Sequence, residues 1–209
     1  SKMTATQLKG RQKDHEAAEN TEKAVVPSAF WRESTFAKPQ VSATEYGTVF
    51  HRVMQLLDYR KCVSIEGINE EVERLVNAGL LTLEQASVID TTSIYKFFSS
   101  SIGIRLTTAE SILREFKFSI LEDAKVFEPT LKNEQILLQG VVDCAIIEDD
   151  GITVIDFKTD RVTPETLDSV VSQYSDQIAV YGRALSRIYK LPIKEKILYF
   201  FKLDQAVTL

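Results

Sequence analysis

The stretch GVVDCAIIEDDGITVIDFKTD, residues 140–160, decides how this chain folds. Two apolar runs flank a Glu-Asp-Asp-Gly turn signal, which predicts a β-hairpin with strands over about residues 135–147 and 152–157. Each run contains one acid, Asp143 in the first strand and Asp156 in the second. The pattern therefore predicts a hairpin that carries two carboxylates inside apolar strands.

These two carboxylates are costly to desolvate unless another charge compensates them, and a divalent cation would do so. Asp143 and Asp156 can face the same side of the hairpin. Strand alternation then places Lys158 on the face of Asp156 and Phe157 on the other. A cation-binding oxygen beside an ammonium suits phosphate chemistry. Asp-x-Lys alone more often forms an ordinary ion pair at a strand end.

The rest of the second half predicts two more strands and a helix. Apolar residues alternate over about residues 113–121, which indicates a half-buried strand. A helical region opens at Thr163-Pro-Glu and continues as a long amphipathic helix over 173–189. A further strand is expected over 196–203.

The first half is predicted to be helical. Residues 1–40 are polar and read as a linker or arm. A capping box at Ser42 predicts a helix over about 43–58, and two more helices are expected over 67–78 and 82–99. The element order indicates an α/β fold with a mixed central sheet flanked by helices and a helical N-terminal portion.

Three further side chains are candidates on two of these helices. His51 follows Gly47, and a glycine inside a helix often marks the close approach of another group. Gln177 and Tyr181 stand one turn apart on the long helix. Alone, His51 is more often a structural histidine, and the pair more often a solvated glutamine beside a packed tyrosine.

Composition sets limits on function. A formal charge of −5 argues mildly against an autonomous nucleic-acid binder. Cys62 and Cys144 stand far apart in no Cys-x-x-Cys pattern, so a disulfide framework, a zinc ribbon or a four-cysteine iron–sulfur cluster is not expected. No apolar run approaches the ~20 residues that span a membrane, and a cytoplasmic location is expected.

Five motifs together resemble the RecB-like branch of the PD-(D/E)XK nuclease superfamily, and within it the AddA-type nuclease domains of bacterial helicase–nucleases. They occur in the family's order: Gly47-Thr-Val-Phe-His51, Arg114-Glu-Phe116, Gly140-Val-Val-Asp143, Asp156-Phe-Lys-Thr-Asp160 and Gln177-Ile-Ala-Val-Tyr181. Five elements in register are far more specific than any one of them.

The resemblance implies a metal site and its catalytic partner. His51, Asp143 and Asp156 would coordinate Mg²⁺ or Mn²⁺, with the carbonyl of Phe157 as a further ligand. Lys158 would position or help deprotonate the attacking water and stabilise charge on the scissile phosphate.

Other positions are assigned smaller roles by the same resemblance. Gln177 and Tyr181 would hold the strand or the lysine, and Glu115 would orient a metal-bound water or lie near a second metal. Lys117 stands where such proteins often carry proline, and Gln55 where an acid is common. Neither departure removes an expected metal ligand.

The fold implied is restriction-endonuclease-like, with the nuclease domain over residues 41–209. The function implied is a Mg-dependent deoxyribonuclease domain of an ATP-dependent helicase–nuclease in double-strand-break repair, with an AddB-type partner subunit. No Walker A motif occurs, so ATP would be used only in helicase domains outside this chain. The alternatives are a catalytically silent module that binds DNA or a partner, and an independent exonuclease.

Overall fold

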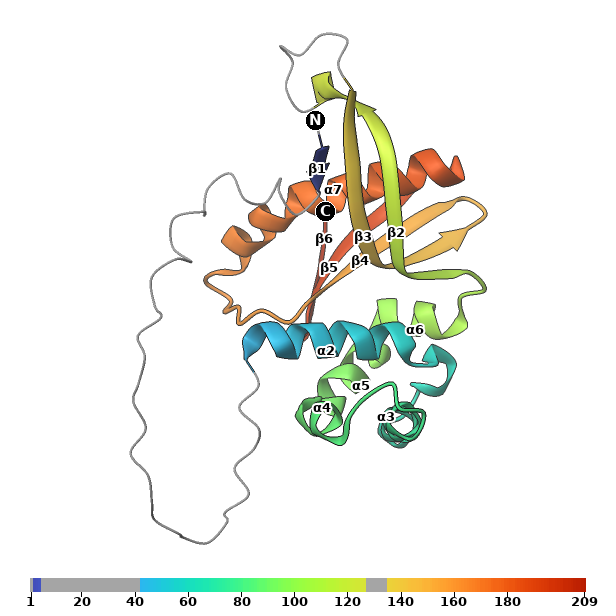
Figure 1. The fold of residues 1–209 in the computed structure, drawn as a ribbon, viewed down its shortest axis with the longest axis vertical. Helices are drawn as coiled ribbons and strands as arrows, with labels where there is room; N and C mark the ends of the chain where they lie inside the picture. Colours follow the sequence, from blue (N-terminus) through green and yellow to red (C-terminus); the bar gives the residue numbers. More distant parts are fainter. Residues whose placement is uncertain (1, 5–41, 127–134) are drawn as a thin grey trace, which may run out of the picture.

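The computed structural model describes residues 2–4, 42–126 and 135–209 (Figure 1). The strands are β1 (Lys2–Thr4), β2 (Ile112–Asp123), β3 (Gln135–Glu148), β4 (Gly151–Lys158), β5 (Ile193–Phe200) and β6 (Gln205–Thr208). The helices are α2 (Ala43–Leu56), α3 (Ile65–Asn77), α4 (Leu83–Val88), α5 (Thr91–Ser99), α6 (Ser101–Thr108) and α7 (Leu167–Tyr189), with short 3₁₀ turns η1 (Tyr59–Lys61) and η2 (Ala124–Val126). The predicted α/β class with a mixed sheet is confirmed.

The sheet is built around β3, which has different neighbours along its two edges. β2 pairs antiparallel along one edge. On the other edge, β1 pairs with residues 137–139 and β4 with residues 144–148. Within the described residues, 140–143 therefore have no strand partner on that edge. β4 continues parallel to β5, and β5 antiparallel to β6.

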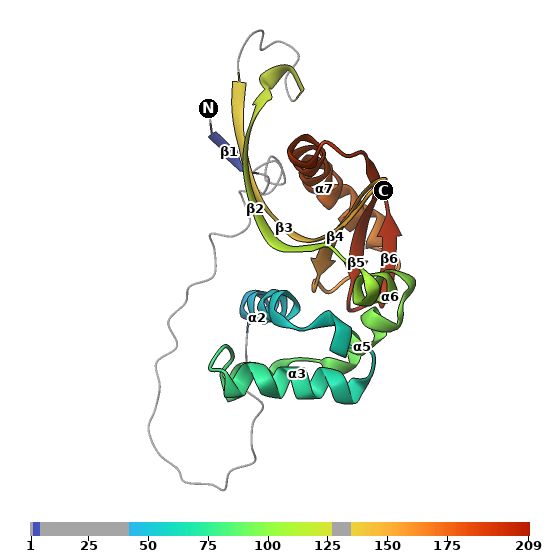
Figure 2. The same ribbon diagram turned by 90° about the vertical axis from the view of Figure 1, so that its right-hand side faces the viewer.

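Helices cover the two faces of this sheet unequally. α7 lies on one face, while α2 to α6 form a layer on the other, as the two views show (Figures 1 and 2). Ile155 and Phe157 of β4 pack toward α2–α6, whereas Ile152 and Val154 pack toward α7. Because α7 connects β4 to β5, it provides the crossover that a parallel strand pair requires. No described helix is long and apolar enough to cross a membrane.

The predicted hairpin is confirmed as β3–β4. Glu148 pairs with Gly151, so the turn has two residues. Gly151 has a φ of 156°, and a Cβ there would lie 2.8 Å from the Pro192 carbonyl oxygen. The position therefore requires glycine. At the other end, the paired register stops at Cys144 opposite Ile155.

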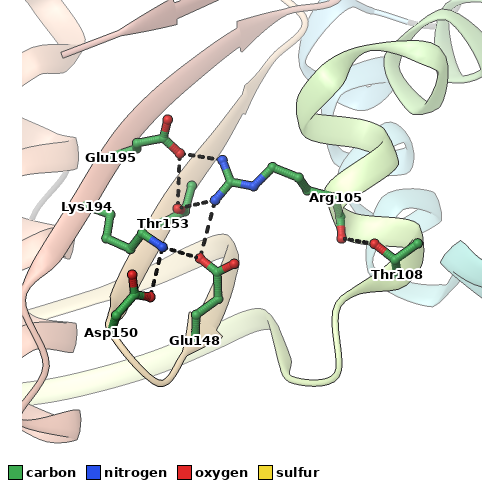
Figure 3. Close-up of polar contacts among 7 residues, drawn as sticks. All are labelled: Arg105, Thr108, Glu148, Asp150, Thr153, Lys194 and Glu195. Carbon is green, nitrogen blue, oxygen red and sulfur yellow. Dashed lines mark hydrogen bonds and ion pairs between the residues drawn. The ribbon is translucent and has the colours of Figure 1, made fainter.

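At the turn end, the hairpin is tied to its neighbours by charged side chains (Figure 3). Arg105 of α6 forms an ion pair with Glu195 of β5 and donates to the Thr153 hydroxyl of β4 at 2.9 Å. It also reaches Glu148, with 3.4 Å between nitrogen and oxygen. These contacts join the helical layer to the sheet far from the gap in β3.

The helix that begins at Ser42 confirms the predicted capping box. The Ser42 hydroxyl accepts from the Glu45 backbone nitrogen at 3.2 Å, and the Glu45 carboxylate accepts from the Ser42 nitrogen at 2.9 Å. Such a box satisfies backbone donors that have no partner within the helix, and so it fixes where α2 begins.

The single helix predicted over residues 82–99 is wrong, because the structure divides it into α4 and α5. Asp90 stands at the division and accepts from the backbone nitrogens of Thr92 and Ser93, which starts a new helix. Ser100 then accepts from the nitrogen of Gly103 and starts α6, a helix that was not predicted.

Other differences concern boundaries. α7 begins at Leu167, after the expected start at Thr163, and β5 covers 193–200 where 196–203 was expected. β1 and β6 were not predicted, because strands of three and four residues carry too little periodicity. Apart from β1, the arm predicted over residues 1–40 lies outside the described residues.

Candidate metal centre and active site

The candidate site begins where β3 and β4 separate. Directly beyond the last pair of the ladder, the Asp143 carboxylate accepts a hydrogen bond from the backbone nitrogen of Phe157 at 2.8 Å. A side chain therefore takes a bond that a strand backbone would otherwise make. This bond holds Asp143 beside the strand that carries Asp156 and Lys158.

Glu115 of β2 lies opposite Asp143 in the strand register and has an unusual backbone. Its φ is 48°, a left-handed conformation that costs a non-glycine residue about 1–3 kcal/mol. Leu113 and Phe116, three positions apart, both pack in the core beneath α7, so the alternation of faces is interrupted between them. This irregularity turns Glu115 out of the regular strand pattern at the point where Asp143 lies.

His51 completes a group of three potential metal ligands from three elements. Its Nδ1 lies 3.5 Å from Asp143 Oδ1 and 4.0 Å from Glu115 Oε1. One ligand atom from each residue falls within 4.8 Å of the others. On α2, a Cβ at Gly47 would lie 3.3 Å from Thr159 Oγ1, so the close approach predicted for this glycine is confirmed.

Asp156 and Lys158 lie on the α7 face of β4, as strand alternation predicts, and both are buried. Their side chains form an ion pair, yet Asp156 Oδ2 makes no hydrogen bond within the described part of the chain. Burial, and then the charge of Asp143, raises the pKa of Asp156 to about 7. A buried carboxylate oxygen with so little compensation fits a site for a cation.

The other members of the cluster respond to the same crowding of negative charge. Burial and then Asp143 raise the pKa of Glu115. Desolvation lowers the pKa of His51, but the hydrogen bond and charge of Asp143 outweigh it, so the pKa is raised overall. Oxygen and imidazole ligands of this kind suit Mg²⁺ or Mn²⁺.

α7 brings a row of polar side chains against Lys158. The Lys158 ammonium donates to Gln177 Oε1 at 3.5 Å, and Gln177 Nε2 donates to the Tyr181 hydroxyl at 2.8 Å. Tyr174, one turn before Gln177, also reaches the ammonium. The spacing of Tyr174 and Gln177 could have suggested this contact, which sequence analysis missed.

The candidate residues share one hollow of about 220 Å³. It is lined by seven of the eight predicted site residues, together with Thr159, Asp160 and Tyr174: the seven are His51, Asp143, Asp156, Phe157, Lys158, Gln177 and Tyr181. Glu115 lines an adjoining hollow that shares His51 and includes Gln55, the position of one departure from the family pattern. The fold therefore gathers into one region residues separated by 130 positions of sequence.

The arrangement of two strand carboxylates, a lysine two residues beyond the second and a histidine from the first described helix is that of a phosphodiesterase site of the PD-(D/E)XK type. A family model described as the PD-(D/E)XK nuclease superfamily matches residues 26–208. The chain belongs to this superfamily, and its nuclease fold is thereby established.

The curated relatives share a single description, that of an ATP-dependent helicase/nuclease subunit of the A type. The chain is 37% identical over its full length to the relative from Bacillus mycoides strain KBAB4, of which it covers 18%. Proteins of the same description from Bacillus cytotoxicus and Clostridioides difficile strain 630 are 39% and 31% identical, over 82% and 89% of this chain and 15% and 16% of their own length. The chain thus spans less than a fifth of these relatives.

Proposed function

We propose that this chain is the metal-dependent deoxyribonuclease domain of an ATP-dependent helicase–nuclease that acts in double-strand-break repair. The observation that carries the proposal is the meeting of His51, Glu115 and Asp143 beside the buried Asp156–Lys158 pair. The likeness to AddA-type helicase/nuclease proteins supports the wider assembly. Domain boundaries of 41–209, with residues 1–40 as a linker, belong to the same proposal.

The residues present fit a divalent cation. His51 and Asp143 would hold it, with the unbonded oxygen of Asp156 and the Phe157 carbonyl as further ligands, and Glu115 close by. The ion would supply a lowered pKa for a bound water and neutralisation of phosphate charge. Mg²⁺ is the ion proposed, with Mn²⁺ as an equivalent and with no iron–sulfur cluster.

The remaining chemistry is assigned to groups of the chain itself. Lys158 places a positive charge at the hollow, where it stabilises charge on the scissile phosphate and orients the attacking water. Gln177, itself bonded to Tyr181, holds the ammonium from the side of α7. Glu115, with its raised pKa, orients a second water at the adjoining hollow.

Substrate and partners follow from charge and from the relatives. With a net charge of −5, this chain alone is expected to bind DNA weakly, so the grip on the strand is delegated to other domains. We propose that those domains contain the ATP-driven helicase, that an AddB-type partner completes the enzyme, and that it works in the cytoplasm.

The test measures cleavage of labelled single-stranded DNA with Mg²⁺. We expect Lys158→Ala and Asp143→Ala to lower the rate at least ~100-fold, because each removes charge stabilisation at the reacting phosphate. Lys96→Ala, at an exposed position on α5, is the matched control and should cleave like the unaltered chain. Undiminished cleavage by Lys158→Ala would contradict the mechanism.

The alternative is a catalytically silent module that binds DNA or a partner protein, and the acidic charge of the chain is what favours it. Calorimetric titration with Mg²⁺ or Mn²⁺ separates the two. A nuclease site predicts saturable binding that Asp143→Asn weakens, whereas a silent module predicts none.

A further inference from the structure

Lys158 is enclosed on a side that neither the metal ligands nor Gln177 occupy. Its Nζ lies 3.6 Å from the centroid of the Tyr174 ring, so the ammonium faces the π surface. Lys158 and Tyr174 are 8% and 6% exposed. A cation–π contact is strongest where the cation has lost its water, as here.

The Tyr174 ring is itself fixed by the chain segment that follows Lys158. Its hydroxyl donates to Asp160 Oδ2 at 2.9 Å. Asp160 comes two residues after Lys158, directly beyond β4, while Tyr174 lies on α7. The contact therefore joins the strand end that carries the lysine to the helix that covers it.

This third contact matters because a lysine side chain has four rotatable bonds and much rotamer freedom. The pair with Asp156 and the bond of 3.5 Å to Gln177 restrain the ammonium from two directions only. The aromatic face closes a third direction with a surface that cannot compete as a proton acceptor. The ammonium is thus held at the hollow by three different groups.

We propose that Tyr174, oriented by Asp160, is a positioning residue that holds Lys158 for catalysis. The proposal rests on the proposed nuclease function. It assigns a role to two residues outside the predicted site, and it does so through an aromatic face whose effect can be separated from that of the hydroxyl.

Three variants test the ring. Tyr174→Leu removes the π face and keeps an apolar side chain, and we expect kcat to fall ~10–100-fold while KM for single-stranded DNA changes less than ~3-fold. Tyr174→Phe keeps the ring and should retain kcat within ~3-fold. Tyr189→Leu, the same substitution near the end of α7, is the control and should leave kcat unchanged.

Asp160 provides a second test if Tyr174→Leu fails to fold. Asp160 is exposed, so its substitution spares the core. We expect Asp160→Ala to lower kcat ~2–5-fold, and Asp160→Asn, whose amide oxygen still accepts from the tyrosine hydroxyl, to restore it.

A measurement independent of cleavage is the NMR signal of the Lys158 ε-methylene, assigned by its loss in Lys158→Met. The ring current of Tyr174 should shift it upfield; Tyr174→Leu should abolish the shift and Tyr174→Phe preserve it. If the shift persists in Tyr174→Leu, or if kcat of that variant equals that of Tyr189→Leu, the proposal is overturned. A chain that shows the shift but cleaves no DNA overturns the proposed function instead.

Discussion

The β3–β4 hairpin carries charged side chains at both of its ends, and the two groups differ in how their charges are balanced. At the turn, Lys194 of β5 donates to Asp150 at 2.8 Å and to Glu148 at 3.1 Å (Figure 3). At the open end, Asp143 and Asp156 lie side by side with Lys158 paired to one of them. The turn therefore has a cation for its acids, whereas the open end has more acids than cations.

The pKa values reflect this difference. The hydrogen bond from Lys194 lowers the pKa of Asp150, and the bond from Arg105 lowers that of Glu195. At the open end, burial raises the pKa of Asp156 and of Glu115. One end of the hairpin thus stabilises the ionised acids, and the other holds them ready for an added positive charge.

The largest expected effect on stability comes from the titration of Asp156. Because its pKa of about 7 exceeds the usual value of 3.8, the folded chain binds this proton more tightly than the unfolded chain. The stability this contributes is full below pH 3.8 and is lost as the pH rises to about 7. Without metal, we expect the free energy of unfolding to fall by about 2–3 kcal/mol between pH 5 and 8 relative to Asp156→Asn.

Guanidinium unfolding in EDTA at both pH values measures this loss. Asp150→Asn, the same substitution at the turn end, is the matched control and should show the pH dependence of the unaltered chain. Equal pH dependence in Asp156→Asn and the unaltered chain would show that the open end is not charge-strained.

A second prediction compares the two ends by metal addition. Ligand that binds only the folded state stabilises it by about 2.7 kcal/mol at one hundred times its Kd. We expect Mg²⁺ or Mn²⁺ to raise the Tm of the unaltered chain and not that of Asp143→Asn. Asp149→Asn, at the exposed turn, should respond fully. An equal rise in both variants would place the ion elsewhere.

A third prediction concerns the network at the turn. Arg105→Met removes a donor from the buried hydroxyl of Thr153 and the partner of Glu195. These groups are partly exposed apart from Thr153, so we expect a loss of about 1 kcal/mol in the free energy of unfolding. Cleavage should be unchanged. Denaturant midpoints measure it, with the exposed Arg60→Met as control, and a fall in kcat would mean that the two ends are coupled.

The smallest effect is expected at Asp150, whose side chain is 73% exposed. Its pair with Lys194 is screened by water and salt, so Asp150→Asn should leave the unfolding midpoint at pH 7 unchanged. Thermal unfolding at low and at high salt checks this. A clear destabilisation that disappears in high salt would mean that the turn charges act as one network.

Much of the candidate site could be predicted because its elements are encoded locally. Alternation alone put Asp156 and Lys158 on one face of β4, and the capping box at Ser42 placed the start of the helix that carries His51. The division between α4 and α5 was missed because a single Asp90 cap outweighed a continuous apolar pattern.

The partners of Lys158 could not be derived in the same way. Tyr174 reads as an apolar member of an amphipathic helix, and only the packing of α7 on β4 turns its ring toward the ammonium. Glu115 was assigned a role by resemblance, but no local pattern announces a φ of 48° in the middle of a strand. That conformation persists only where the surrounding structure imposes it.

The sequence by itself determined the hairpin, the face of each strand acid and the start of α2, because turn chemistry, strand alternation and helix capping act over a few residues. Only the tertiary structure decided that His51 and Glu115 converge on Asp143, that the oxygen of Asp156 is left without a hydrogen bond, and that α7 encloses Lys158. Those features depend on the packing of distant elements, and burial within that packing is what shifts the charges of the site.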